Sequence, residues 1–417
     1  MAVVTTLAAA LPNVKVLDVF ALPTAHASPH PKLFASLSQF ALLESLTFAP
    51  YAKEGQYQLS AQKCSGIAEI KSLKSLSLHV HCIVSLAPLA SLPSLSILEV
   101  TAHDYDSYGM SQLTGLVSLS FDVNHGYLPP LFCLTNLTSL CLTGRGGSEL
   151  PDGLAACSKL QRLHISRYRF NNALHFPFLN ELSFDLNPSH GNFPNPLLLP
   201  MLKTMHVTEM LVGQNLPIPS FVAFLTAACN IVPFSLTLDT LEITGASKHK
   251  CQKPCSALLR AISSPLPIWS NLHCHRLELL GLSFEPTQLS QLLSHFSNPK
   301  ALYLHRCNLA SSTLLEAVQS LYDLEELYVS VEAISECQIF AVCSAAYARP
   351  NSSQLRFFVH IAGAEERGPI GERKGPSIRS LRKAWRELLP DRGGPSNKVS
   401  LKVTLSSLFS YSEWQRR

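Results

Sequence analysis

The chain has 417 residues, and its 33 Lys and Arg against 29 Asp and Glu give a formal net charge of only +4. This small charge excludes a general nucleic-acid binder, which needs a concentrated basic face. Charged residues make up 15% and hydrophobic residues 47%, which excludes a mostly disordered chain. Leucine occurs 71 times, about 17% of the residues. This excess predicts an architecture that uses leucine as a repeated unit.

The N-terminal segment has no Lys or Arg before Lys15, so it lacks the basic start of a secretory signal. The longest uncharged run, Met210–Leu238, contains prolines and amides, and its apolar part, Phe221–Val232, is too short to span a bilayer. Twelve cysteines without regular pairing favour a reducing compartment. We therefore expect a soluble protein of the cytoplasm or nucleus, with no membrane partner.

One apolar frame recurs along the chain, with apolar residues at steps of three, three and two, as in Leu92, Leu95, Leu98 and Val100. Most copies follow one another at intervals of 19 to 30 residues, in or near the range of known leucine-based repeats. If the third apolar residue is taken as the anchor, the anchors are Leu17, Leu46, Leu76, Leu98, Leu119, Leu140, Leu163, Leu182, Met205, Leu241, Leu280, Leu302 and Leu327, with a weak final copy at Leu355, Phe357 and Val359.

The closing Leu-x-Leu of each copy predicts a short strand, because alternate side chains of a strand face opposite sides. One coil cannot bury its apolar face alone, so successive coils should stack and pair their strands in parallel. The short intervals in the middle leave room only for extended or 3₁₀ returns. We expect helical returns from about residue 219 onwards, at Pro219–Cys229, Thr287–Phe296 and Ser311–Leu321.

This frame, over about residues 10–360, resembles the leucine-rich-repeat family, and its irregular intervals resemble the solenoids of fungal F-box and leucine-rich-repeat proteins. The resemblance implies an α/β leucine-rich-repeat solenoid, a horseshoe with a parallel inner sheet and mixed helical and extended outer returns. In that family an F-box docks a ubiquitin-ligase adaptor while the solenoid presents substrates. Here the first frame starts at Leu11, which leaves no room for an F-box. Adaptor binding is therefore expected only if an F-box lies upstream, and the early start suggests a missing cap or a truncated gene model.

Three segments are expected: a solenoid over residues 1–361, a basic Gly/Pro-rich insertion over 362–398, and a terminal strand or cap over 399–417. The insertion contains a basic amphipathic helix candidate, Ser377–Leu389, which we interpret as a cap for the last coil. Val399–Leu405 alternates as a strand would.

The strand residue that follows each anchor should face away from the coil interior. If the strands align, these residues form a ladder on the concave face, where repeat proteins bind partners. Its predicted members are Asp18, Thr47, Ser77, Glu99, Ser120, Cys141, His164, Ser183, His206, Glu242, Gly281, Tyr303 and Tyr328, and the next outward position adds His79, Asp122, Asp185, His305 and Ser330. Because tyrosine is favoured at binding hot spots, the candidate binding residues are His164, His206, Tyr303, His305, Arg306 and Tyr328.

Two other clusters have weaker interpretations. Cys251, Cys255, His273 and His275 are zinc ligands by type, but their spacing matches no standard zinc signature. The alternative is a solvated loop beside a buried Cys274. Gly144–Ser148 lacks the Gly-Lys-Ser/Thr ending of a phosphate loop, so we interpret it as a turn between two coils.

The sequence favours a non-enzymatic protein-interaction scaffold, without catalytic residues or a cofactor, that binds a protein partner on its concave face. It could be a substrate-recognition subunit of a ubiquitin ligase. One alternative is a metal-binding or hydrolytic protein that uses the 249–275 insertion. Another is a receptor-type recognition domain, which disulfide content would distinguish.

Overall fold

A computed structural model provides the structure of the chain. The residues that it describes are 2–20, 31–49, 58–105, 109–125, 131–149, 152–169, 175–184, 199–212, 223, 235–244, 272–282, 284, 288–296, 299–305, 307, 314–315, 319, 321, 323–331, 341–342, 345, 355–362 and 399–406. The chain divides into two compact units, Met1–Thr204 and Met205–Arg417, which are described separately.

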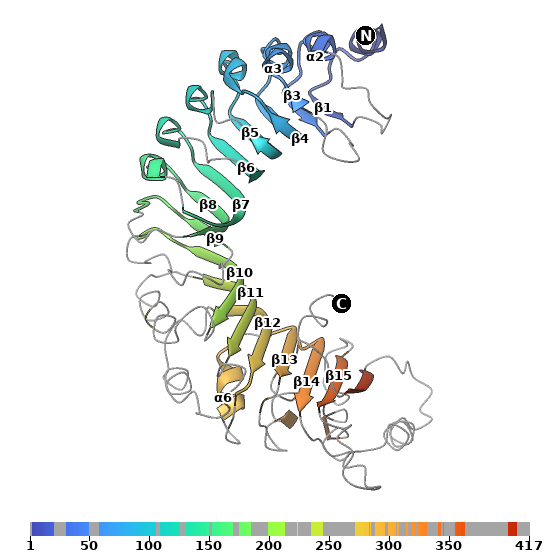
Figure 1. Cartoon of the computed structure of the whole chain (residues 1–417), viewed down its shortest axis with the longest axis vertical. Helices are drawn as coiled ribbons and strands as arrows, with labels where there is room; N and C mark the ends of the chain where they lie inside the picture. The colour runs from blue at the N-terminus through green and yellow to red at the C-terminus, as the bar shows by residue number, and fades with distance from the viewer. Residues whose placement is uncertain are drawn as a thin grey trace. The chain divides into compact units, whose positions relative to one another are not determined.

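Unit 1 alternates strands with short helical returns (Figure 1). Its strands are β1 (Val16–Val19), β2 (Ser45–Phe48), β3 (Gln58–Leu59), β4 (Ser75–Ile83), β5 (Ile97–Tyr105), β6 (Ser118–His125), β7 (Ser139–Glu149), β8 (Arg162–Arg169) and β9 (Glu181–Phe184). Its α-helices are α1 (Ala2–Ala10), α2 (Pro31–Leu37) and α3 (Ala61–Ile67), and its 3₁₀ helices are η1 (Ala87–Ser91), η2 (Met110–Gln112), η3 (Leu131–Cys133) and η4 (Asp152–Ala156).

The strands of unit 1 pair in parallel in the order β1-β2-β4-β5-β6-β7-β8-β9, with β3 beside the far end of β4. The anchor leucines lie opposite one another in register, from Leu17 and Leu46 through to Leu163 and Leu182. From Leu46 onwards these anchors are almost completely buried. Each such side chain contributes about 1.5–3 kcal/mol by leaving water.

Backbone hydrogen bonds repeat from coil to coil just before the strands. The Ser96 carbonyl accepts from the Val117 and Ser118 amides at 2.8 and 3.0 Å, and the Val117 carbonyl accepts from Thr138 and Ser139 in the same way. The carbonyl just before one strand therefore fixes where the next strand begins along the sheet. This repeated bonding keeps the strands in register without an insertion at each step.

Interval length determines the type of return. The two long early intervals hold α2 and α3, whereas the shorter intervals of the middle coils hold η1 to η4. The 3₁₀ returns agree with the prediction for the middle of the chain. The expectation that helical returns begin near residue 219 is wrong, because a 29- or 30-residue interval early in the chain has the same room for a helix.

The glycine-rich stretch Gly144–Ser148 is not a turn, contrary to the prediction, but belongs to strand β7. The β7–β8 register shifts between Thr143 and Ser148, as at a bulge. A Cβ on Gly144 would lie 2.4 Å from the Tyr168 ring. Glycine is needed there because the buried Tyr168 ring occupies the space of a side chain.

Unit 2 contains β10 (Thr204–Val212, which begins at the boundary), β11 (Ser235–Thr244), β12 (Leu272–Leu280), α6 (Gln288–Ser294), β13 (Ala301–His305), β14 (Glu326–Val331), β15 (Leu355–Ala362) and β16 (Val399–Ser406). β11 to β16 pair in parallel in chain order (Figure 1). Helix α6 confirms the helix predicted at Thr287–Phe296. Strands β15 and β16 confirm the weak copy at Phe357 and the strand predicted from Val399.

Both units therefore have the predicted fold, a leucine-rich-repeat solenoid with a parallel sheet and mixed outer returns. Apart from Ala223, the return predicted at Pro219–Cys229 lies outside the described residues, as do the candidate helix at Ser377–Leu389 and most of Ser311–Leu321. None of the helices in the described ranges is long and apolar enough to cross a membrane.

The seven described cysteines form no disulfide: Cys64, Cys82, Cys133, Cys141, Cys157, Cys274 and Cys307. Several of them replace leucine at interior positions, as Cys157 does in the coil that ends in β8. Burial raises the pKa of the Cys157 thiol to about 11. These side chains pack as small apolar residues.

Candidate functional site

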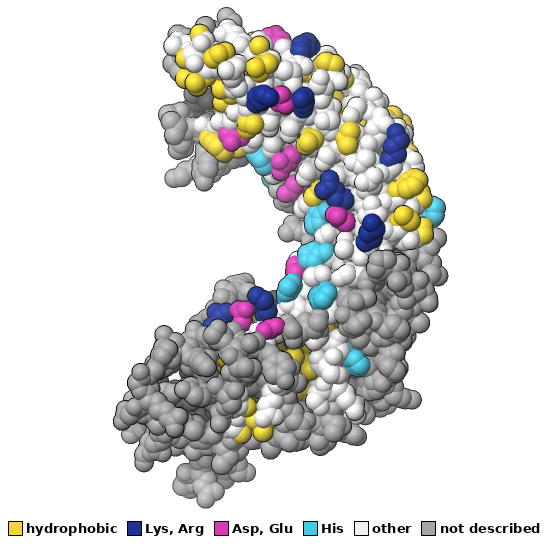
Figure 2. All heavy atoms as spheres, turned by 180° about the vertical axis from the view of Figure 1, so that it is seen from behind, with side chains coloured by type: hydrophobic (Ala, Val, Ile, Leu, Met, Phe, Trp, Pro, Cys, Tyr) yellow, Lys and Arg dark blue, Asp and Glu magenta, His cyan; other side chains and the backbone are white. Residues whose placement is uncertain are grey.

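The parallel register of unit 1 aligns the residues that follow the anchors into one row, here called the inner ladder. It runs Asp18, Thr47, Ser77, Glu99, Ser120, Cys141, His164 and Ser183, each opposite the next. All eight are partly or fully exposed and, unlike the leucines beside them, face away from the coil interior. Several histidine side chains (cyan) are exposed on the face shown in Figure 2.

Neighbouring ladder residues hold one another by hydrogen bonds. The Ser77 hydroxyl donates to Glu99 Oε2 at 2.8 Å, and Ser77 Oγ lies 3.0 Å from Nε2 of His79. Because the single hydroxyl proton goes to Glu99, His79 must donate to Ser77. His164 Nδ1 lies 2.9 Å from the Ser183 hydroxyl on the next strand. These bonds orient the ladder before any ligand arrives.

Cys141 lies between Ser120 and His164 in the ladder, but its environment disfavours the reactive thiolate. Burial is the main cause that raises the pKa of the Cys141 thiol. The nearby carboxylates of Asp122 and Glu99 act in the same direction. A thiol held protonated is a poor nucleophile, so Cys141 contributes packing and a weak hydrogen bond rather than reactivity.

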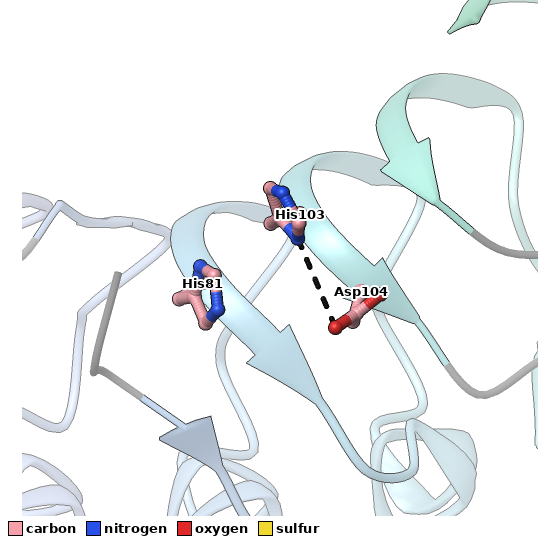
Figure 3. A group of neighbouring side chains, drawn as sticks. All are labelled: His81, His103 and Asp104. Atoms are coloured by element: carbon pink, nitrogen blue, oxygen red, sulfur yellow. Dashed lines mark ion pairs between the residues drawn. The ribbon is translucent and has the colours of Figure 1, made fainter. Parts of the chain in front are cut away.

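A second group of polar side chains lies beyond the ladder in unit 1 and was not predicted. His81 of β4, and His103 and Asp104 of β5, have ligand atoms that all lie within 4.8 Å of one another (Figure 3). The prediction ended each strand at its Leu-x-Leu, whereas β4 and β5 continue to Ile83 and Tyr105. The alternation of Ser77, His79 and His81 was the signal that could have shown this extension.

In unit 2 the ladder follows a register that differs from the prediction at one strand. Leu277 lies opposite Leu241 and Leu302, so Leu277 and not Leu280 is the anchor of β12. The ladder residue is therefore Glu278, and the assignment of Gly281 is wrong. Leu277-Glu-Leu279 and Leu280-Gly-Leu282 both fit Leu-x-Leu, and the choice between them depends on pairing with β11 over eight residues.

Three of the predicted binding residues come together in unit 2. Tyr303 and Tyr328 are register partners, and their rings stack with centroids 5.7 Å apart. The ring of His305 lies 4.9 Å from that of Tyr328 and 6.3 Å from that of Tyr303. Arg306 lies outside the described residues.

Charged side chains extend this aromatic group into a continuous series of contacts across four strands. The Arg276 guanidinium lies 4.1 Å from the centre of the Tyr303 ring, and Arg276 Nε lies 2.6 Å from Glu278 Oε1. The Tyr303 hydroxyl donates to Glu326 Oε2 at 2.5 Å, and Glu326 also pairs with Arg356. We call Arg276, Glu278, Tyr303, His305, Glu326, Tyr328 and Arg356 the tyrosine cluster.

Tyr303 is an internal member of the tyrosine cluster and is only 7% exposed. Burial raises the pKa of its phenol, and the hydrogen bond to Glu326 raises it further against the opposing charge of Arg276. Burial also raises the pKa of Tyr328. The structure thus shows that Tyr303 is largely covered by its neighbours, and its role in binding stays a prediction.

Two further predicted binding residues are placed separately. His206 of β10 lies 2.9 Å, Nε2 to Oδ1, from Asp239 of β11, and both side chains are about two-fifths exposed. His164 belongs to the inner ladder of unit 1.

The candidate metal ligands of the insertion are only partly described. His273 and His275 are exposed residues of β12 on either side of Cys274. Burial raises the pKa of Cys274 to about 12, and its thiol donates to the Arg276 carbonyl at 3.3 Å, which fits its predicted burial. Cys251 and Cys255 lie outside the described residues, so that zinc site stays a prediction.

Comparison with known proteins gives similarity only among solved structures. No protein-family model matches the chain, and no curated protein matches it. An internalin, InlF from Listeria monocytogenes, is similar at 15% identity and a TM-score of 0.48, over 80% of this chain and 85% of that one. The APL1 leucine-rich repeat domain is similar at 12% identity and a TM-score of 0.38, over 93% and 98%.

The register of the strands and the stacking of their leucines thus define the class of this molecule. Each of its two units has the fold of a leucine-rich-repeat solenoid, with strands paired in parallel and their leucines in register. The narrower likeness to fungal F-box proteins stays a prediction.

Proposed function

We propose that this chain is a non-enzymatic scaffold that binds a protein partner along the solvent-facing side of its strands. The observation that carries the proposal is the inner ladder of unit 1, which presents eight outward side chains on successive, rigidly paired strands. Because these side chains are mostly short and partly fixed by one another, binding would cost little conformational entropy. Long, regular concave faces of this kind suit extended protein surfaces.

The ladder has a polar character that favours a partner with basic and hydrogen-bonding groups. Asp18 and Glu99 are acidic members, and Asp122 occupies the next outward position on β6. A partner segment with lysine or arginine side chains would meet carboxylates at intervals set by the strands. Such complementarity increases the association rate and the specificity more than the affinity.

The contact between His164 and Ser183 does not by itself support a hydrolase. A serine nucleophile needs a base that is oriented by a third group, together with donors for the developing oxyanion. His164 and Ser183 instead lie in an open row of a sheet, where paired side chains of adjacent strands ordinarily meet. The scaffold proposal therefore assigns them a binding role.

A role as the substrate receptor of a ubiquitin ligase is a narrower version of this proposal. It requires an F-box, the segment that docks the ligase adaptor in the family that the sequence resembles. Its test is direct binding of the purified full chain to the ligase adaptor. Binding would support the receptor role, whereas its failure would remove that role and leave the scaffold proposal intact.

To test the scaffold proposal, the full chain is used to capture a binding partner, which is then purified for affinity measurements. Glu99→Lys and Ser120→Arg alter the inner ladder, whereas Gln112→Arg places the same kind of charge on the exposed outer return η2. We expect at least one ladder variant to lower the affinity for the partner by about tenfold or more, equivalent to about 1.4 kcal/mol. Equal affinity for all three variants would overturn the proposed surface.

A further inference from the structure

His81, His103 and Asp104 form a cross-strand group near the C-terminal ends of β4 and β5. Val80 pairs with Ala102 and Cys82 with Asp104, so the intervening His81 lies opposite His103. The two imidazole rings stack with centroids 4.7 Å apart and 24° between their planes. His103 Nδ1 lies 3.8 Å from the Asp104 carboxylate (Figure 3).

The local shape of both strands places these side chains on the solvent side. The side chains of β4 alternate regularly up to His81, after which His81 and Cys82 are both partly exposed before the buried Ile83. On β5, His103 and Asp104 are likewise consecutive outward residues before the buried Tyr105. The same break in alternation on two paired strands brings three ligand-type side chains to one place.

We propose that His81, His103 and Asp104 bind a borderline divalent transition-metal ion, of which Zn²⁺ is the best match. Two imidazole nitrogens and one carboxylate oxygen are a donor set that suits zinc, whereas calcium and magnesium prefer oxygen alone. The three ligands leave at least one position for water or a partner side chain. The bound ion would tie β4 to β5 on the face that carries the inner ladder.

The geometry requires only side-chain adjustment. Tetrahedral ligands at about 2.0–2.1 Å from zinc lie about 3.3 Å from one another, compared with the 4.8 Å limit within which the three present atoms fall. Rotations about the χ angles of three partly exposed side chains supply a contraction of this size. The two strands need not move, because their pairing already places His81 beside His103.

The surroundings also favour a cation. On β5, Glu99 lies two outward positions before His103, and Asp122 of β6 is the register partner of the intervening Thr101. On β4, His79 lies one outward position before His81. The backbone of His125 on β6 is the register partner of Asp104. Clustered acidic groups raise the local concentration of cations. This site lies on two adjacent short coils and is distinct from the candidate metal site predicted in the 249–275 insertion.

The test uses the full chain, freed of metal by chelation and titrated with Zn²⁺ by calorimetry. Co²⁺ serves as a spectroscopic probe, since imidazole ligands produce visible ligand-field bands. The variants are His81→Gln, His103→Gln and Asp104→Asn, with His175→Gln as a matched control on an exposed histidine that belongs to neither candidate metal site. A Cys251→Ser/Cys255→Ser double variant reports on the insertion.

We expect one Zn²⁺ per chain and a rise in thermal stability that depends on Zn²⁺ concentration. Each of the three ligand variants should weaken binding by more than the roughly 10–100-fold that loss of a supporting group costs. His175→Gln and the double cysteine variant should retain it. Binding should also weaken under acidic conditions, because imidazole must lose its proton to coordinate a metal.

Two outcomes would overturn the proposal. The first is the absence of Zn²⁺ and Co²⁺ binding to folded protein at micromolar metal. The second is binding that survives all three ligand variants, including binding that the double cysteine variant alone removes. Circular dichroism of each variant separates a lost ligand from a lost fold, and partner binding is measured separately from metal binding.

Discussion

The guanidinium of Arg276 lies over the ring of Tyr303, 4.1 Å from its centre, while its Nε bonds the buried Glu278. Arg276 thus makes a cation–π contact with Tyr303 of β13 and an ion pair with Glu278 of its own strand, β12. Tyr303 extends this series of contacts by donating a hydrogen bond to Glu326 on β14. The tyrosine cluster is therefore a continuous set of charge-assisted contacts, and its parts should be energetically coupled.

The first prediction concerns the hydrogen bond between Tyr303 and Glu326. In a double-mutant cycle of Tyr303→Phe and Glu326→Gln, we expect a coupling free energy of about 1 kcal/mol, because one donor acts on a charged acceptor. Urea unfolding of the four proteins measures it. Additive free energies of unfolding would show that the short contact contributes nothing.

The second prediction tests the register of β12. Leu277 is fully buried as the anchor, whereas Leu280 is only partly buried. Leu277→Ala should cost about 2–5 kcal/mol of unfolding free energy, and Leu280→Ala clearly less. If Leu280→Ala were the more damaging, the frame first expected from the sequence would be restored.

The sequence predicted most of unit 1 and less of unit 2 for a physical reason. In unit 1 the apolar frame fits each coil in only one way, in the long early intervals as well as in the short later ones. Eight ladder residues therefore lie where they were expected. Around β12 two overlapping Leu-x-Leu segments compete, and only pairing with the neighbouring strand distinguishes Leu277 from Leu280. The metal candidate at His81 was missed because strand length depends on what the next strand can pair with.

The third prediction concerns Gly109, which precedes η2 with φ of +96°. A Cβ there would lie 2.2 Å from the Ala87 nitrogen of the preceding return. Gly109→Ala should therefore cost about 3 kcal/mol or more, through both strain and backbone overlap. Gly115→Ala, where the nearest atom would be at an ordinary 3.6 Å, should change stability by less than about 0.5 kcal/mol, as measured by thermal and urea unfolding.

The fourth prediction is a loss of stability at alkaline pH. Burial raises the pKa of Cys64, Cys274 and Cys307 to about 12 and that of Cys157 to about 11. An unfolded thiol loses its proton near pH 8.5, so above that pH the folded state binds more protons. Stability should therefore be fully present below about pH 8.5 and fall up to about pH 11–12, by about 1.4 kcal/mol per pH unit for each thiol.

Urea unfolding at a series of pH values measures this slope. Cys64→Ala should reduce the alkaline slope by about one thiol's share while also lowering stability at neutral pH. Alkylation followed by peptide mass analysis gives a second readout, in which the partly exposed Cys133 should react well before Cys157. A slope unchanged by Cys64→Ala would contradict the assignment.

The most direct test of the central claim is site-specific photo-crosslinking to a purified partner. A photoreactive amino acid replaces Ser120, on the inner ladder in β6, or Phe132, which is 57% exposed on the outer return η3. The account predicts covalent capture of the partner from position 120 and little or none from position 132. Capture from position 132 with none from position 120 would show that the partner binds the outer returns, which would contradict the account.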